Sequence, residues 1–102
     1  MFNSWQNLKN SIEYPKSGIF SKELFRDEKI NLTLFCLASG AEISEHTSTK
    51  KGFIHVVEGK GLFQLAGNNV SMEENVFISM EDNAIHFLRA ETNLSFLLFL
   101  ID

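Results

Sequence analysis

From Ile19 to the C-terminus, short β-prone runs alternate with turn sequences about every eight to twelve residues. Gly67-Asn68-Asn69 is a clear hairpin turn, because Gly and Asn tolerate positive φ. So many short strands in an open sheet would leave unpaired edges. The pattern therefore predicts an all-β fold closed as a double-sheet jelly roll or barrel, with a lumen for one small ligand. The expected strands cover residues 19–25, 30–38, 43–48, 53–57, 62–66, 70–72, 76–80, 85–89 and 94–101.

The segment before these runs has a different pattern. A short helix is expected over residues 5–12, with Ser4 as its N-cap and Pro15 beyond its end. Its apolar face would consist of Trp5, Leu8 and Ile12. Residues 1–17 are therefore expected to form an N-terminal helix and arm, and residues 18–102 a single barrel domain.

Composition and charge narrow the possible partners. Hydrophobic residues make up 44% of the chain, enough for a real core, and the net charge of -4 with no basic stripe argues against nucleic acid as a partner. No apolar run approaches the roughly 20 residues that cross a bilayer. With a polar N-terminus and a lone Cys36, which we expect to be a small buried hydrophobe, a cytoplasmic protein is expected.

Two histidine-bearing segments stand out among the expected strands. Gly40 is followed, after five residues, by His46, and Gly59 closes the same segment; the second segment ends at His86. This order of turns, strands and histidines, over about residues 18–101, resembles the two sequence motifs of the cupin superfamily and its small RmlC-like members. The resemblance implies a cupin-type double-stranded β-helix, or jelly-roll barrel, with a short N-terminal helix.

The resemblance also implies a metal position, but an incomplete one. In cupins, three histidines and a glutamate converge inside the barrel on a divalent metal such as zinc, nickel, iron or manganese. Here only His46 and His86 match; Ser48 stands at the second histidine position and Gly52 at the glutamate position. Catalytic zinc sites generally have three protein ligands, so two imidazoles are thin support for a bound metal.

Two acidic residues lie near His46 in sequence. On a regular strand Glu45 would point away from the histidine, because neighbouring residues alternate between faces. Glu42 has the same parity as His46 but lies four residues earlier. Neither position matches a cupin ligand.

Three functions remain open. The first is a binding module that holds a small organic molecule in its lumen through His46, Ser48 and His86, since a neutral imidazole donates from one nitrogen and accepts on the other. The second is a metal-dependent enzyme, an isomerase or dioxygenase, with a reduced histidine set. The third is a structural or interaction protein without a working lumen, in which both histidines are ordinary half-buried side chains. No catalytic residue is identified, so enzymatic activity is left open.

Several expected strands are apolar on both faces, which one small barrel can hardly bury by itself. Phe53, His55 and Val57 would form an outward row on one such strand. A large exposed apolar patch is unusual for a monomer, so we expect a homodimer with these three residues at the interface. The alternative is a bulge that turns His55 inward as a third metal ligand.

Overall fold

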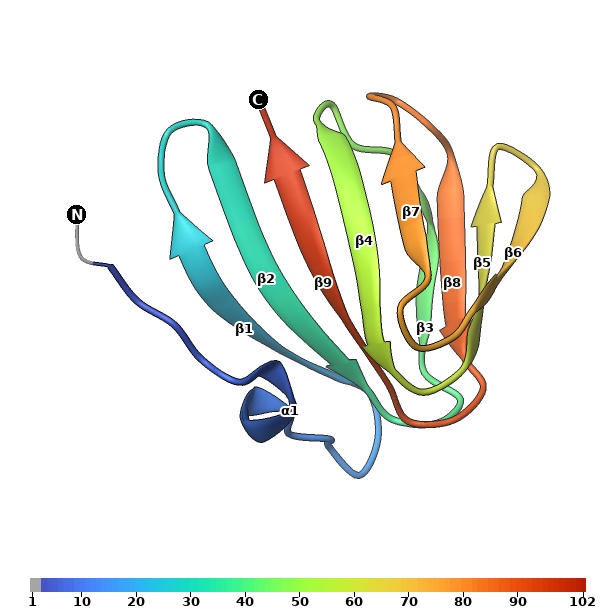
Figure 1. The fold of residues 1–102 in the computed structure, drawn as a ribbon. Helices are drawn as coiled ribbons and strands as arrows, with labels where there is room; N and C mark the ends of the chain where they lie inside the picture. The colour runs from blue at the N-terminus through green and yellow to red at the C-terminus, as the bar shows by residue number, and fades with distance from the viewer. Residues whose placement is uncertain (1–2) are drawn as a thin grey trace.

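The computed structural model describes residues 3–102, and all nine expected strands are present in two antiparallel sheets. Figure 1 shows the larger sheet in front, with the smaller sheet behind it and to its right. The larger sheet has the order β1 (Ile19–Arg26), β2 (Ile30–Leu37), β9 (Leu94–Ile101), β4 (Lys51–Glu58), β7 (Phe77–Met80). The smaller has the order β3 (Glu42–His46), β8 (His86–Ala90), β5 (Gly61–Leu65), β6 (Asn68–Met72). The all-β double-sheet expectation is confirmed.

The N-terminal helix is shorter than the sequence suggested. It is a single turn, α1 (Leu8–Ser11), whose N-cap is Asn7, not Ser4; the Asn7 side chain accepts a hydrogen bond from the Lys9 N–H at 3.0 Å. Trp5 lies before the helix and is 92% exposed, so it packs on nothing. One turn is too short to be stable alone, so packing decides where it forms. Within residues 3–102, no helix is long and apolar enough to cross a membrane.

Strand alternation sends apolar side chains to both faces of the larger sheet. On β9, Phe96 and Leu98 point toward the smaller sheet, whereas Leu97 and Phe99 point the other way. The inward side chains meet those of the smaller sheet, notably the fully buried Phe63, and form the main core. Because the two sheets are held apart by these side chains, the space between them can enclose a lumen.

A second apolar cluster lies on the outer face of the larger sheet. Its buried members are Leu34, Cys36, Val57 and Leu97, and they are covered by Leu8, Ile12 and Tyr14 of the N-terminal segment. Cys36 is fully buried, as expected, and burial raises the pKa of its thiol. The N-terminal segment thus covers part of a face on which the sequence led us to expect a partner subunit.

Gly59 connects β4 to β5 and has a structural reason to be glycine. Its φ is +94°, and a Cβ at this position would collide with the backbone of Asn93. Only glycine accepts both the conformation and the close approach. The closing glycine of the first motif therefore belongs to the turn and not to the lumen.

Candidate functional site

A β-bulge in β3 positions His46. The ladder between β3 and β8 pairs Ile43 with Leu88, then shifts register so that His46 lies opposite His86. As a result Ile43 and His46 line the same cavity, although regular alternation would separate them. Glu42 is left exposed, with its Oε2 3.9 Å from Nη1 of Arg89. The parity argument that placed Glu42 on the same face as His46 was wrong because of this bulge.

The two histidines meet at one place in the fold. Their ring centroids are 4.0 Å apart, with an angle of 64° between the rings. His86 is 8% exposed and stacks on Phe63, whereas His46 is exposed at the rim. Adjacent strands thus bring together two imidazoles that are far apart in sequence.

Backbone carbonyls determine the tautomer of both rings. Nδ1 of His46 lies 2.7 Å from the carbonyl oxygen of Ser44, and Nδ1 of His86 lies 2.9 Å from that of Ala84. A carbonyl only accepts, so each Nδ1 carries the proton and donates it. Each neutral ring therefore presents the lone pair of Nε2, and no hydrogen bond within residues 3–102 reaches either Nε2. The pair offers two acceptors, where the sequence predicted a donor and an acceptor on each ring.

The electrostatics of the pair favour the neutral form of His86. Burial lowers its pKa below the ordinary value of 6.5, and the neighbouring His46 lowers it further. The hydrogen bond to the carbonyl of Ala84 acts in the opposite direction but is the smaller effect. His86 is therefore neutral near pH 7, with its Nε2 lone pair available.

Two cavities with shared lining residues adjoin the histidines, and together they are called the lumen here. The inner part is a cavity of ≈ 150 Å³ between the sheets, and the outer part is a smaller cavity of ≈ 80 Å³ toward the mouth. Both are lined by His46, His86, Met80 and Leu98. The remaining lining of the inner part is apolar: Phe35, Ile43, Ile54, Leu88 and Phe96. The outer part adds Ser48, Lys50, Glu81 and Leu100.

Ser48 therefore lies where the sequence reasoning placed it, beside both histidines. Its Oγ accepts a hydrogen bond from the backbone N–H of Lys50 at 3.1 Å. The hydroxyl proton remains free to donate toward the lumen. The three residues predicted to bind a ligand are thus gathered around one cavity; their role in binding stays a prediction.

The described residues do not complete a metal site. No cluster of three or more His, Cys, Asp or Glu able to hold a metal occurs among residues 3–102. Gly52 stands at the glutamate position, and a Cβ built there would lie 2.8 Å from Cε of Met80. The space that a glutamate side chain would need at this position is thus occupied by the thioether side chain of Met80. His46 and His86 supply two ligands of the right tautomer, one fewer than catalytic zinc sites generally have.

Met80 and Lys50 are among the lumen-lining residues that the sequence did not predict. Met80 fills core space, and it also borders both cavities. Lys50 lies in a turn, where no strand periodicity indicates a direction. Strand alternation alone would place Met80 on the same face as Ile78. Which face of the strand points into the lumen, however, depends on how the two sheets pack.

The predicted interface residues occupy the outer face of the larger sheet. Phe53 and His55 both point outward, and Nε2 of His55 lies 3.4 Å from Oδ1 of Asn75. The alternative in which His55 turns into the lumen is therefore wrong. Val57 faces the same side but is already covered by the N-terminal segment, so it is not available to a partner.

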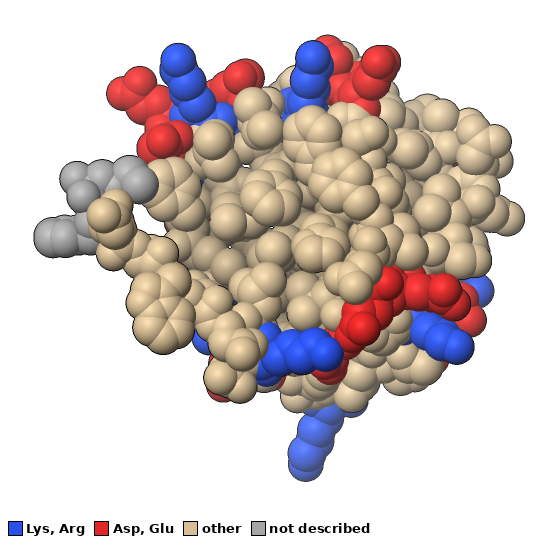
Figure 2. All heavy atoms as spheres, viewed as in Figure 1, with Lys and Arg blue, Asp and Glu red and all other residues tan. Residues whose placement is uncertain are grey.

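Beyond the part that the N-terminal segment covers, the middle of this outer face is open and carries no charged side chains (Figure 2). Figure 2 shows a broad face without Lys, Arg, Asp or Glu over β2, β9 and β4, hollowed near its middle, with charged side chains at its rims. A depression of ≈ 260 Å³ on it is lined by Phe53, Phe77, Phe99 and Ile101. Phe77 is 62% exposed.

Comparison with known proteins identifies the fold. No protein-family model matches the sequence, and neither does any curated protein sequence. Among solved structures, a cupin superfamily protein from Desulfitobacterium hafniense aligns over 93% of this chain and 88% of its own, at 19% identity and a TM-score of 0.87. An RmlC-like cupin from Desulfovibrio desulfuricans aligns over 98% and 97%, at 18% identity and a TM-score of 0.87. Salicylate 1,2-dioxygenase from Pseudoaminobacter salicylatoxidans aligns over 82% of this chain and 26% of its own, at 18% identity and a TM-score of 0.76.

Proposed function

We propose that this chain, which has the cupin fold, binds a small organic molecule in its lumen, with His46 and His86 as polar anchors and Ser48 beside them. The observation that carries the proposal is the pair of Nε2 lone pairs next to an otherwise apolar cavity. Apolar pockets with a few convergent polar groups are the usual form of a ligand site. A ligand that suits two acceptors brings a donor, such as a hydroxyl group.

The size of the lumen limits the ligand. Its inner part measures ≈ 150 Å³, and a protein cavity of about that volume accommodates benzene. The ligand's apolar body is therefore a small ring or a short branched chain. A lumen with this much space gives little support to a purely structural barrel without a working cavity.

A metal-dependent enzyme is the competing function. Salicylate 1,2-dioxygenase shares the fold, and the Nε2 lone pairs of the two histidines are what a divalent metal requires. Against this, neither Ser48 nor Gly52 supplies the missing ligands, and Glu42 points away. We therefore place lumen binding first and metal catalysis second.

Metal analysis separates these two functions. The protein is purified without a nickel column, and its zinc, nickel, iron and manganese contents are measured. We expect substoichiometric metal in the wild type. Stoichiometric metal that disappears in a His46→Ala, His86→Ala double variant would reject the binding-module function in favour of a metal centre.

Ligand titration tests the binding function directly. Phenol is a suitable probe because it combines a benzene-sized body with one hydroxyl donor, and fluorobenzene of similar size lacks the donor. We expect phenol to bind more tightly, by about three- to tenfold, the value of one neutral hydrogen bond. The double variant should lose this preference. Absence of phenol binding by nuclear magnetic resonance at millimolar concentration would contradict the proposal.

The outer face supports a second element of the proposal, a homodimer. Phe53, Phe77, Phe99 and Ile101 form an apolar depression on this face, and the charged side chains lie at the rims of the face (Figure 2). Self-association through this face would bury the aromatic rings that one copy leaves open. A second copy brings the same uncharged surface, so no unpaired charge is buried.

A charge placed on this face tests the dimer. His55→Asp would bury a carboxylate against apolar neighbours and should weaken dimerisation by at least about tenfold. Ser71→Asp, an exposed change on the smaller sheet, is the control and should leave the mass unchanged. Light scattering over a dilution series gives the mass; a wild-type monomer at all concentrations, or identical behaviour of both variants, would contradict the homodimer.

A further inference from the structure

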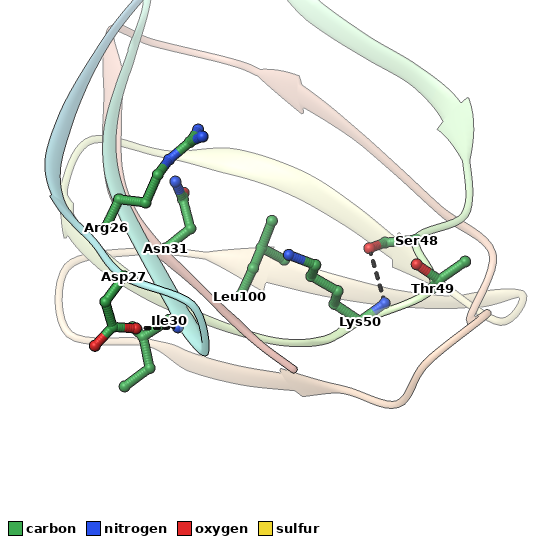
Figure 3. A pocket seen from close by; sticks show the side chains of 8 residues that line it. All are labelled: Arg26, Asp27, Ile30, Asn31, Ser48, Thr49, Lys50 and Leu100. Carbon is green, nitrogen blue, oxygen red and sulfur yellow. Dashed lines mark hydrogen bonds between the residues drawn. The ribbon is translucent and has the colours of Figure 1, made fainter.

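A second cavity lies directly outside the lumen. It measures ≈ 370 Å³ and is lined by residues from the β1–β2 hairpin, the β3–β4 connection and the end of β9. Ser48, Lys50 and Leu100 border both this outer cavity and the mouth of the lumen. In Figure 3, Lys50 extends from its turn toward Leu100, between Arg26 and Asn31 on one side and Ser48 and Thr49 on the other. Lys50 therefore lies at the boundary between this cavity and the lumen.

Two of the charged side chains that line the ≈ 370 Å³ cavity already have partners within the β1–β2 hairpin. Arg26 binds Glu23, with its Nη2 2.8 Å and its Nε 3.0 Å from the same carboxylate oxygen. Asp27 accepts hydrogen bonds at 2.8 Å from the backbone N–H groups of Lys29 and Ile30. These bonds hold the pKa of the Asp27 carboxyl below its usual range and fasten the hairpin turn. Both groups are thus local structural partners.

Lys50 is held far more loosely. Its Nζ lies 3.8 Å from Oδ1 of Asp102, and the two side chains are 41% and 54% exposed. Exposed ion pairs at such a separation contribute little to stability, so another anion can replace the carboxylate of Asp102. The charge that opposes Lys50 at the mouth is Glu81, which is exposed and borders the same ≈ 80 Å³ cavity.

These positions define three chemical zones along one path. The inner cavity is apolar, and the histidine pair beside it presents two acceptors. At the mouth, Lys50 with its ammonium group and Ser48 with its hydroxyl border the same ≈ 80 Å³ cavity. A matching ligand has an apolar body for the inner cavity, a hydroxyl group for the histidine pair and an anionic group for the mouth. An ammonium and a hydroxyl donor together suit a carboxylate.

Building on the proposed lumen function, we propose that Lys50 is the anion-recognising residue of the site and that the ligand is a small hydroxy acid. Its hydroxyl group donates to Nε2 of His46 or His86, its apolar body occupies the inner cavity, and its carboxylate pairs with the Lys50 ammonium at the mouth. Binding exchanges the weak Lys50–Asp102 contact for a partly desolvated, charge-assisted hydrogen bond.

Three probes separate the parts of this proposal. 3-Hydroxybenzoate carries the ring, the hydroxyl and the carboxylate; 3-hydroxybenzamide replaces the carboxylate by a neutral group of the same shape; phenol lacks it. We expect the wild type to bind the acid at least about tenfold more tightly than the amide, the low end for a hydrogen bond to a charged group. Titration calorimetry gives the three affinities.

Matched variants assign this preference to one side chain. Lys50→Met should remove the preference for the acid over the amide, and Lys50→Arg should retain most of it. Lys51→Met is the control, because Lys51 pairs with Ile101 on the outer face and should leave all three affinities unchanged. Glu81→Gln should increase the preference for the acid over the amide, because it removes a negative charge that repels the ligand's carboxylate at the mouth.

The outcomes distinguish this inference from the function on which it rests. Equal affinities for acid and amide in the wild type, or a preference that survives Lys50→Met, would overturn the role of Lys50 while phenol binding still supports a lumen ligand. Failure of all three probes to bind would overturn both. Loss of the preference in Lys50→Met and in Lys51→Met alike would show a general charge effect and would also reject the assignment.

Discussion

Two polar clusters lie on opposite sides of the larger sheet. They differ in whether their polar atoms already have hydrogen-bond partners within the protein. On the inner side of the sheet, Nδ1 of His46 and of His86 donates to a nearby backbone carbonyl. Nε2 of each ring has no hydrogen-bond partner within residues 3–102, and both side chains border a cavity. On its outer side, under the N-terminal segment, the hydroxyl of Tyr14 donates to Oε2 of Glu58 at 2.8 Å and lies 3.1 Å from Oγ of Ser95.

The outer cluster of Tyr14, Glu58 and Ser95 stabilises the fold and leaves no donor for a ligand. Burial, opposed by the Ser95 hydrogen bond but reinforced by Glu58, raises the pKa of Tyr14 to about 12, so the phenol stays protonated and its donor stays engaged. The hydrogen bond joins the N-terminal segment to β4. The comparison shows that a buried polar side chain indicates a binding site only where it retains an unused donor or acceptor and adjacent space.

The largest expected difference is between an inner and an outer aromatic side chain. Phe96 is 1% exposed and stacks on Phe35 at 5.2 Å, so Phe96→Ala should lower the free energy of unfolding by about 3–5 kcal/mol. Phe77→Ala, at a position 62% exposed, should cost about 1 kcal/mol or less in a dilute, monomeric sample. Urea denaturation measures both; equal losses would mean that the two faces are equally buried within one copy.

Loss of the phenol hydroxyl should have an intermediate effect. Tyr14→Phe leaves the half-buried Glu58 carboxylate without its donor and should cost about 1–2 kcal/mol of unfolding free energy. Glu58→Gln keeps a neutral acceptor for Tyr14 and should cost less. Urea denaturation again applies, and a Tyr14→Phe variant as stable as the wild type would show that this hydrogen bond does not hold the N-terminal segment.

The smallest expected effect is the pH dependence that His86 introduces. Because its pKa is lower in the folded protein than the ordinary 6.5, the unfolded chain binds the proton more readily. This contribution to stability is complete above about pH 6.5 and is lost as the pH falls through that value toward the folded pKa. Thermal unfolding between pH 7.5 and 5 should show a shallower decline for His86→Gln than for the wild type.

The control for the pH experiment is Ser71→Ala, an exposed change on the smaller sheet that removes no titratable group and should keep the wild-type decline. If His86→Gln and the wild type lose stability in parallel, burial does not disfavour protonation of His86.

Local sequence patterns predicted most of the strands and turns correctly. Alternation and turn residues act over a few residues, so the runs from Ile19 to Ile101 could be placed, and the spacing of Gly40, His46 and His86 indicated the fold. The errors came where distant packing overrides local parity. The bulge in β3 reversed the direction expected of Glu42, and the N-terminal segment covered Val57.

By itself, the sequence determined a closed double-sheet fold with a histidine on each of two distant strands, because hydrophobic alternation and turn chemistry are properties of short segments. Only the tertiary structure decided that the two imidazoles meet, which nitrogen each presents, that an empty space lies beside them and that Lys50 stands at its mouth. These features depend on strand register and on how two sheets pack, and both result from contacts between residues far apart in the chain.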